Sequence, residues 1–207
     1  MAGQILYFGD PMCSWCYGFA PHISKIRDHF KKDLDFRLVM GGLRPGGTEK
    51  IGSMSSFLKH HWEEVNERSG QLFSYEIFDD PNFVYDTEPP CRAVVTIREM
   101  DPLKEFDFFK AVQSAFYQQN SDTNKTSTYT DIANTFDIDS SSFTRLFESE
   151  EIKTKTQKDF EFSQKLGVRG FPSTVLMYNE KYFLLANGYQ EANSIIPIID
   201  SILTTAD

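Results

Sequence analysis

The sequence is poor in cysteine and in basic residues, and it has no long hydrophobic run. Three cysteines in 207 residues are too few, and an odd number, for the disulfide framework of a small secreted protein. Lys and Arg number 21 against 30 Asp and Glu, and the resulting net charge of −9 would repel a phosphate backbone or an anionic membrane surface. No stretch approaches the ~20 apolar residues that a membrane-spanning helix needs. We therefore expect neither nucleic acid nor a membrane among the partners of this chain.

The first residues of the sequence bear on the cellular location of the protein. Residues 1–10 run directly into an apolar, strand-like stretch and show neither a basic n-region nor a small-residue cleavage site. No secretory signal is visible, and a cytoplasmic location is expected. In a reducing compartment, paired cysteines are more often catalytic, regulatory or metal-bound than structural. The spacing of the cysteines therefore matters more than their number.

The opening of the chain predicts a β-α-β unit. Residues 4–9 and 36–40 are short apolar runs typical of strands. Between them, apolar residues recur every three or four positions, which predicts a helix that begins near Cys13–Cys16. Two strands joined through a single helix should lie parallel to each other.

The middle and the end of the chain have different patterns. Helical periodicity dominates after the second strand, and the predicted helices span residues 54–69, 90–100, 103–119, 129–136 and 142–166. A strand hairpin and a closing helix then follow, over residues 173–178, 182–186 and 192–203. Pro197 fits the first turn of that last helix better than its middle. The order is therefore β-α-β, a helical insert and β-β-α, which is an α/β arrangement.

Cys13-Ser14-Trp15-Cys16 stands where the first strand ends and the first helix begins. Two cysteines at this spacing on a first helical turn can close a short disulfide with little backbone movement. The first sulfur lies against the free N–H groups and the positive end of the helix, which favours the nucleophilic thiolate. We expect Cys13 to be the exposed attacking sulfur and Cys16 the more buried resolving one.

Three alternatives to a redox pair are a zinc half-site, two unconnected cysteines and a structural disulfide. Zinc would need two further ligands. The remaining candidates are Cys91 and four histidines, and they form no second compact pair in the sequence. We therefore expect no metal site.

A second motif, Gly167-Val168-Arg169-Gly170-Phe171-Pro172-Ser173-Thr174, precedes the third predicted strand. The strand–CxxC–helix start, the helical insert and this Gly-Val-x-Gly-x-Pro segment resemble the DsbA-like thioredoxin family. The opening Asp10-Pro11-Met12-Cys13-Ser14-Trp15-Cys16-Tyr17 is most similar to its cytoplasmic, FrnE-like branch of predicted protein-disulfide isomerases. The similarity covers nearly the whole chain. It implies a thioredoxin fold (β-α-β … β-β-α) with an all-helical insertion, divided into a thioredoxin-like domain of residues 1–45 and 167–207 and an insertion domain of residues 46–166.

The resemblance also implies a substrate-binding cleft beside the CxxC. In the family the matching proline is cis and lies against the dithiol, so Phe171–Pro172 is the implied cis peptide. Related oxidoreductases often have a small or β-branched residue before this proline, and Phe171 should narrow access to Cys13 or offer the substrate an aromatic face. Trp15 is either a hydrophobe on the helix rim or a substrate contact. Arg169, if it faces the cleft, favours an anionic thiolate or a glutathione carboxylate.

Two further residues have more than one candidate role. Asp10 could cap the start of the helix, but a carboxylate close to Cys13 would instead oppose thiolate formation. Cys91 opens a predicted insert helix, and a lone cysteine on an apolar helix face is usually an inert small hydrophobe. The matching helix start in relatives faces the active-site cleft, which would make Cys91 a third redox thiol.

The function predicted from these features is that of a thiol–disulfide oxidoreductase of the reductase or isomerase type. It would act on protein or small-molecule thiols and disulfides through a mixed disulfide at Cys13, without a bound cofactor and with glutathione as a candidate co-substrate. The alternatives are a glutathione-dependent kappa-type transferase or isomerase, which usually has serine at the first cysteine position, and a non-catalytic adaptor of the same fold. We expect the helical insert to pack as a lid over Cys13.

Overall fold

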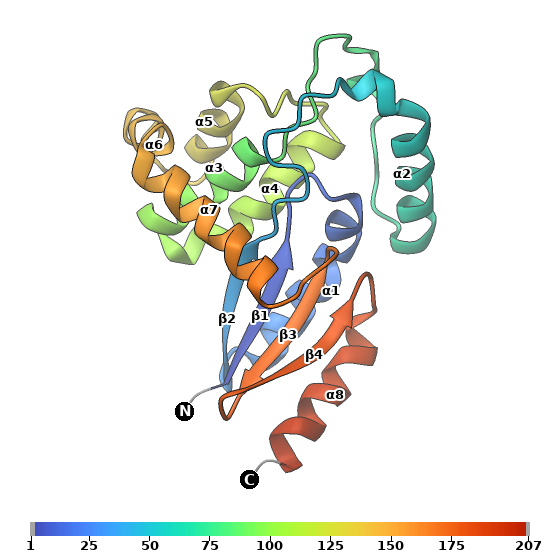
Figure 1. Cartoon of the computed structure of the whole chain (residues 1–207), viewed down its shortest axis with the longest axis vertical. Coiled ribbons are helices and arrows are strands. Elements are labelled where there is room, and N and C mark those ends of the chain that lie inside the picture. The colour runs from blue at the N-terminus through green and yellow to red at the C-terminus, as the bar shows by residue number, and fades with distance from the viewer. Residues whose placement is uncertain (1–2, 206–207) are drawn as a thin grey trace.

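A four-stranded mixed sheet forms the lower half of the molecule in the computed structural model, which describes residues 3–205 (Figure 1). The strand order is β2-β1-β3-β4, with β1 at Gly3–Gly9, β2 at Leu34–Met40, β3 at Ser173–Tyr178 and β4 at Lys181–Asn187. β1 and β2 are parallel, whereas β3 runs antiparallel to both of its neighbours. The predicted β-α-β start and the predicted hairpin at the end of the chain therefore form one sheet.

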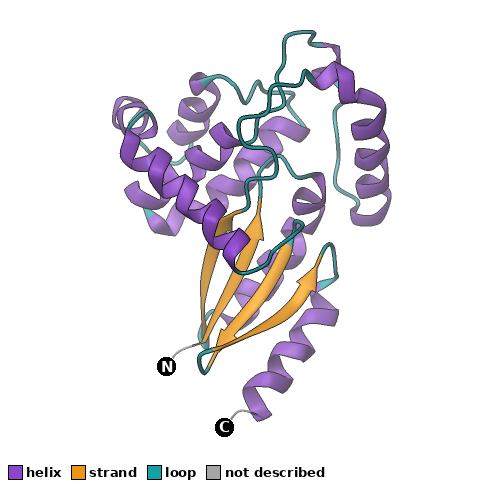
Figure 2. Cartoon of the chain, in the orientation of Figure 1, coloured by secondary structure: helices purple, strands orange, loops and turns teal. Residues whose placement is uncertain are grey.

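Alternation of apolar side chains along β1 gives the sheet two buried faces. Ile5 and Tyr7 belong to the large core with α1 (Ser14–Phe30) and α8 (Ala192–Thr205). Leu6 and Phe8 point the other way, into a small cluster that Phe162 of α7 (Glu150–Lys165) covers. Helices thus cover both faces, as an α/β sheet requires (Figure 2).

The chain between β2 and β3 is helical. Besides α7 it forms three short 3₁₀ turns and five further helices: α2 at Ser55–Ser69, α3 at Glu88–Met100, α4 at Glu105–Tyr117, α5 at Thr126–Asn134 and α6 at Ser140–Phe147. Figure 1 shows α3–α7 clustered beyond the upper ends of β1 and β2, with α2 apart from them and beside α1. The predicted thioredoxin fold with a helical insertion is confirmed.

One hydrophobic core runs from the sheet into the helical insert. Ile5 and Phe19 belong to the same buried cluster as Val94 of α3 and Phe109 of α4. The insert therefore shares its interior with the sheet. The division of the chain into residues 46–166 and two flanking segments stays a prediction.

Two predictions about helices were wrong. Residues 142–166 form two helices, α6 and α7, because the Ser149 hydroxyl accepts a hydrogen bond from the backbone N–H of Ile152 and caps the start of a new helix. Pro197 is the sixth residue of α8 and lies beyond its first turn. The other predicted strands and helices differ from the observed ones by no more than a few residues at their ends.

A proline inside α1 removes one backbone hydrogen bond of the helix, and a residue of the insert replaces it. Pro21 has no N–H to donate to the carbonyl of Tyr17, four residues earlier. The Gln71 side chain, just beyond α2, donates to that carbonyl at 3.2 Å. The first turns of α1, which carry the CxxC, are therefore tied to the insert.

A buried ion pair fixes the end of β2 to the helices above it. Asp159 of α7 accepts hydrogen bonds from the Met40 backbone N–H at 2.9 Å and from Arg98 of α3 at 2.8 Å. Arg98 also donates to the Leu38 carbonyl at 3.0 Å and to Glu105 of α4 at 2.6 Å. This pair holds β2 where its last residue leads into the loop beside Phe171. Among the residues described, no helix is both long and apolar enough to cross a bilayer.

Candidate active site

Cys13 and Cys16 meet at the N-terminus of α1, beyond the upper end of β1. Cys13 is the N-cap residue, and its Sγ accepts the backbone N–H of Cys16 at 3.4 Å. Both residues are free thiols. The expectation that Cys13 is exposed was wrong, because Cys13 is only 5% exposed. Cys16 and Cys91 are fully buried. The order of accessibility is still the predicted one.

The predicted cis peptide is confirmed, and it lies against the dithiol. Phe171–Pro172 is cis, and the Phe171 carbonyl accepts the Cys13 thiol at 3.5 Å. The Phe171 ring packs against Gly41, where a Cβ atom would lie 2.4 Å from the ring carbon Cε1. The half-buried ring also contacts the small cluster under α7. The backbone of Phe171, more than its ring, is therefore placed next to the Cys13 sulfur.

Trp15 faces a groove between α1 and α2. Its half-buried ring lies 5.8 Å from the ring of Tyr189, and the Arg68 guanidinium lies 5.1 Å from the same Tyr189 ring. Trp15 lines an open groove of about 470 Å³ together with Glu64, Glu67 and Arg68 of α2. Residues of the insert therefore do reach the CxxC, as the lid prediction requires.

Met12, between the first strand and the CxxC, is held by the insert. The Tyr85 hydroxyl donates to the Met12 carbonyl at 2.6 Å, and the Thr123 hydroxyl contacts the Met12 Sδ at 3.3 Å. All three residues are buried. The backbone that leads into Cys13 is thus positioned from above by two separate parts of the insert.

Asp10 lies buried under the dithiol, and its predicted role as the helix cap was wrong. Cys13 caps the helix itself, while the Asp10 carboxylate accepts the Met12 N–H at 2.9 Å, the Leu43 N–H at 2.8 Å and the Cys91 thiol at 3.4 Å. Burial raises the pKa of Asp10 above its usual value, and these donors oppose that rise only in part. The hydrogen bonds satisfy the carboxylate oxygens in the absence of water.

The fully buried Cys16 thiol is hard to ionise. Burial raises the pKa of Cys16 well above the ordinary thiol value, and the hydrogen bond and the charge of Cys13 raise it further. The backbone N–H of Asp10 lowers it, whereas the Asp10 carboxylate raises it. The Tyr7 hydroxyl is buried close to this thiol but stops short of a formed hydrogen bond. The Cys16 thiol therefore lies in a nearly dry environment.

Residues 4–193 match the family profile described as a DSBA-like thioredoxin domain. The chain belongs to the DSBA-like thioredoxin domain family. This match spans the CxxC, the cis proline and the whole helical insert, and it confirms the family that the two sequence motifs predicted.

Solved structures with this DSBA-like fold agree in architecture over the full length. The crystal structure of a putative protein disulfide isomerase from Nitrosomonas europaea is 33% identical, with a TM-score of 0.92 and 100% of both chains covered. The cytosolic disulfide reductase DsbM from Pseudomonas aeruginosa is 19% identical, with a TM-score of 0.81 over 98% of this chain and 99% of that one. DsbM with GSH is 20% identical, with a TM-score of 0.77 over 97% and 99%. A search of the curated proteins gives no match.

Arg169, the remaining predicted substrate contact, is not brought to the dithiol. It is exposed and lines a separate cavity of about 260 Å³ with Val168, Ser173 and Leu184, and no residue of the CxxC lines that cavity. Within residues 3–205, no cluster of three or more His, Cys, Asp or Glu side chains could hold a metal ion.

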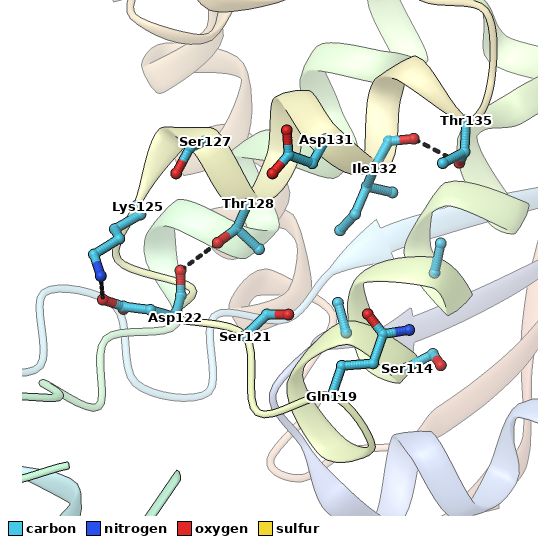
Figure 3. Close-up of a pocket in the computed structure, with 12 residues that line it drawn as sticks. Ser114, Gln119, Ser121, Asp122, Lys125, Ser127, Thr128, Asp131, Ile132 and Thr135 are labelled. Atoms are coloured by element: carbon cyan, nitrogen blue, oxygen red, sulfur yellow. Dashed lines mark hydrogen bonds and ion pairs between the residues drawn. The ribbon is translucent and has the colours of Figure 1, made fainter.

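A pocket of about 550 Å³ lies on the insert, between α4, α5 and the loop that joins them (Figure 3). Its polar wall includes the ion pair of Lys125 with Asp122 at 3.2 Å and the Thr128 hydroxyl, which donates to the Asp122 carbonyl. None of the sequence-predicted site residues lines it. The chemistry-bearing residues gather instead at the end of β1.

Sequence reasoning missed the contacts that converge on the dithiol from the insert. Thr87 and Cys91 of the α3 start, with Tyr85 and Thr123, are ordinary insert residues in the sequence, and no periodicity places them near Cys13. The one available signal was Cys91, whose alternative role rested on the resemblance to the family.

Proposed function

We propose that this protein is a thiol–disulfide oxidoreductase that uses Cys13 and Cys16 to reduce or isomerise disulfides. The observation that carries the proposal is the position of the Cys13 sulfur, at the start of α1 and 3.5 Å from the carbonyl of the cis Phe171–Pro172 peptide. The sulfur there contacts the backbone N–H of Cys16 and the carbonyl of Phe171, and Cys13 is the most accessible of the three cysteines, at 5% exposed.

The reaction balances as two thiol–disulfide exchanges. The Cys13 thiolate attacks one sulfur of a substrate disulfide, a Cys13–substrate bond forms, and the other substrate sulfur leaves and takes up a proton. Cys16 then loses its proton and attacks the Cys13 sulfur. The substrate sulfur that was bonded to Cys13 leaves and takes up a proton. Two electrons have passed to the substrate, and the protein holds a Cys13–Cys16 disulfide.

The disulfide form must be reduced again by two equivalents of a thiol, and glutathione is the candidate that the neighbours support. One similar structure is titled as DsbM with GSH, and DsbM itself as a cytosolic disulfide reductase. Two glutathione thiols would give oxidised glutathione and restore both cysteines, with no bound cofactor. A cytoplasmic location, where the glutathione pool is reducing, fits this cycle.

The substrate would enter along the groove beside Trp15. Trp15 and the neighbouring Tyr189 offer an aromatic surface, and Arg68 and Glu67 on α2 offer both signs of charge. The Phe171 carbonyl can accept a backbone hydrogen bond from an extended substrate once the Cys13 thiol no longer donates to it. Arg169, which is exposed and lines a separate cavity, would contact only substrates that extend into that cavity.

The test is a reductase assay with defined cysteine variants. The wild-type chain should reduce insulin disulfides with glutathione as the thiol source, and Cys13→Ser should abolish the activity. Cys16→Ser should stop turnover after one mixed disulfide. Cys91→Ser is the matched control, because it changes a buried thiol that the cycle does not use, and it should retain activity. Activity that survives the Cys13→Ser, Cys16→Ser double change would instead identify a non-catalytic adaptor.

A further inference from the structure

We propose that a groove between α1 and α4 is a binding site for a short, uncharged stretch of peptide backbone, recognised by the buried side-chain amide of Gln113. The groove has a volume of about 320 Å³, and its walls come from α1, from α4 and from the segment that follows α2. Neither cysteine of the CxxC lines it. The site is therefore separate from the dithiol, and it adds a binding function to the proposed redox function.

The groove lies on the side of α1 that faces away from the proposed substrate groove. Tyr17, Pro21 and Ser24 line it at spacings of four and three residues, which places them on one face of the helix. Trp15 and His22 point to the opposite face, because an α-helix turns by about 100° per residue. A ligand bound between α1 and α4 would therefore leave the surface beside Trp15 free.

Gln113 of α4 lines this groove with an amide that is not paired. Its side chain is fully buried, and within residues 3–205 neither its Nε2 nor its Oε1 has a hydrogen-bond partner. The other buried residues of α4 are apolar or aromatic. A buried amide without partners is costly, and an apolar side chain of similar length would avoid that cost. The amide at this position therefore points to a ligand that pairs with it.

Polar side chains around Gln113 are already paired within the protein. Lys110 forms an ion pair with Asp107 at 2.8 Å. Gln71 donates to the Tyr17 carbonyl at 3.2 Å, and Gln118 donates to the Tyr17 hydroxyl. The charge of Lys110 is thus compensated, so the groove favours an uncharged ligand. The group that is left to recognise this ligand is the Gln113 amide.

A peptide backbone matches this amide in chemistry and the groove in length. A glutamine side chain offers a carbonyl acceptor and an NH2 donor. In an extended chain, the N–H and C=O of one residue point to the same side and can pair with both. Tyr17 and Ser24, at the two ends of the α1 wall, are about 10 Å apart along the helix axis. That length corresponds to about three residues of extended chain.

The experiment titrates the reduced, full-length protein with acetyl-trialanine N-methylamide, a blocked peptide without charge, and follows it by ¹⁵N NMR. Wild type should show saturable shifts at the backbone amides of groove residues and at the Gln113 side-chain NH2, which gains an acceptor. The same peptide with every amide nitrogen methylated cannot donate to the Gln113 carbonyl. It should bind about tenfold more weakly.

Gln113→Met keeps the length of the side chain and removes the amide. This variant should bind the peptide at least about tenfold more weakly than wild type. It should also melt at or above the wild-type temperature, because it removes an unpaired buried amide. Gln119→Met is the matched control, because Gln119 is an exposed glutamine that does not line this groove, and it should bind like wild type. The Cys13→Ser, Cys16→Ser double variant should bind like wild type as well.

The outcomes separate a peptide site from a structural glutamine. An unmoved Gln113 side-chain resonance in wild type, or equal binding by Gln113→Met, would overturn the inference. A Gln113→Met chain that melts well below wild type or fails to fold would also overturn it, since Gln113 would then have a structural role. Binding that is lost in the double serine variant would place the peptide at the dithiol and contradict the groove. Groove binding without any reductase activity would contradict only the proposed function.

Discussion

The carboxylate of Asp159 allows a measurement of how strongly the insert holds the end of β2. Asp159 is 4% exposed and accepts from both the Met40 N–H and Arg98. Asp159→Asn removes the charge and replaces one of the two acceptor oxygens with an NH2 group, which can only donate. Breaking a buried ion pair costs ~3–5 kcal/mol. Because Arg98 keeps its contact with Glu105, we expect the lower end, a loss of about 3 kcal/mol in the free energy of unfolding.

In a chain of this size, each kcal/mol shifts Tm by about 2–4 °C. Thermal unfolding followed by circular dichroism at pH 7 should therefore show Asp159→Asn melting about 6–12 °C below wild type, and urea unfolding should give a lower midpoint with the same slope. The control is Lys155→Ala, which removes ion pairs with Glu99 and Glu151 at the surface and should melt close to wild type. A loss below about 1 kcal/mol for Asp159→Asn would refute the reasoning, since a pair worth so little behaves as a surface pair.

Three further predictions concern protons and the buried side of the site. Tyr7→Phe should slow the resolution of a mixed disulfide by about tenfold, because the buried Tyr7 hydroxyl, which has no hydrogen-bond partner in the described chain while Cys16 is a thiol, lies close enough to donate once Cys16 ionises; an unchanged rate in rapid-mixing experiments would remove Tyr7 from the mechanism. The same resolving step should accelerate as pH rises past 8, since burial raises the pKa of Cys16; a rate that levels off below pH 7 would contradict this. Burial lowers the pKa of His22, whose ring accepts the Ala192 N–H, so its contribution to stability is complete above the unfolded value of ~6.5 and is lost as pH falls. The free energy of unfolding should therefore decline from pH 7 to 5 in wild type more than in His22→Asn, and equal declines would show that His22 does not carry the effect.

Local patterns in the sequence predicted most of the fold. The strand at the start, the helix beginning at the CxxC and the final hairpin follow from periodicity and turn residues within short windows. The family resemblance placed the cis proline against Cys13, which no local pattern does. Where a helix break depended on a single capping hydroxyl, as at Ser149, periodicity alone joined α6 and α7 into one helix.

The site was predictable only in part, for a physical reason. Cys13 and Cys16 are recognisable because their chemistry requires a fixed spacing on a helix start. The sequence leaves a capping role for Asp10 open, whereas in the structure its carboxylate accepts the Cys91 thiol in the core. A cleft position for Arg169 is one possibility that the sequence leaves open, and in the structure Arg169 is exposed and lines a cavity that no CxxC residue lines.

The central claim is that Cys13 is the sulfur that attacks the substrate. The most direct measurement uses the Cys16→Ser chain, mixed at neutral pH with a peptide that contains one disulfide, followed by acid quenching and peptide mass spectrometry. The account predicts a single stable mixed disulfide, located on Cys13, with Cys91 unmodified. An adduct on Cys91, or no adduct at all while the folded chain retains its structure, would contradict it.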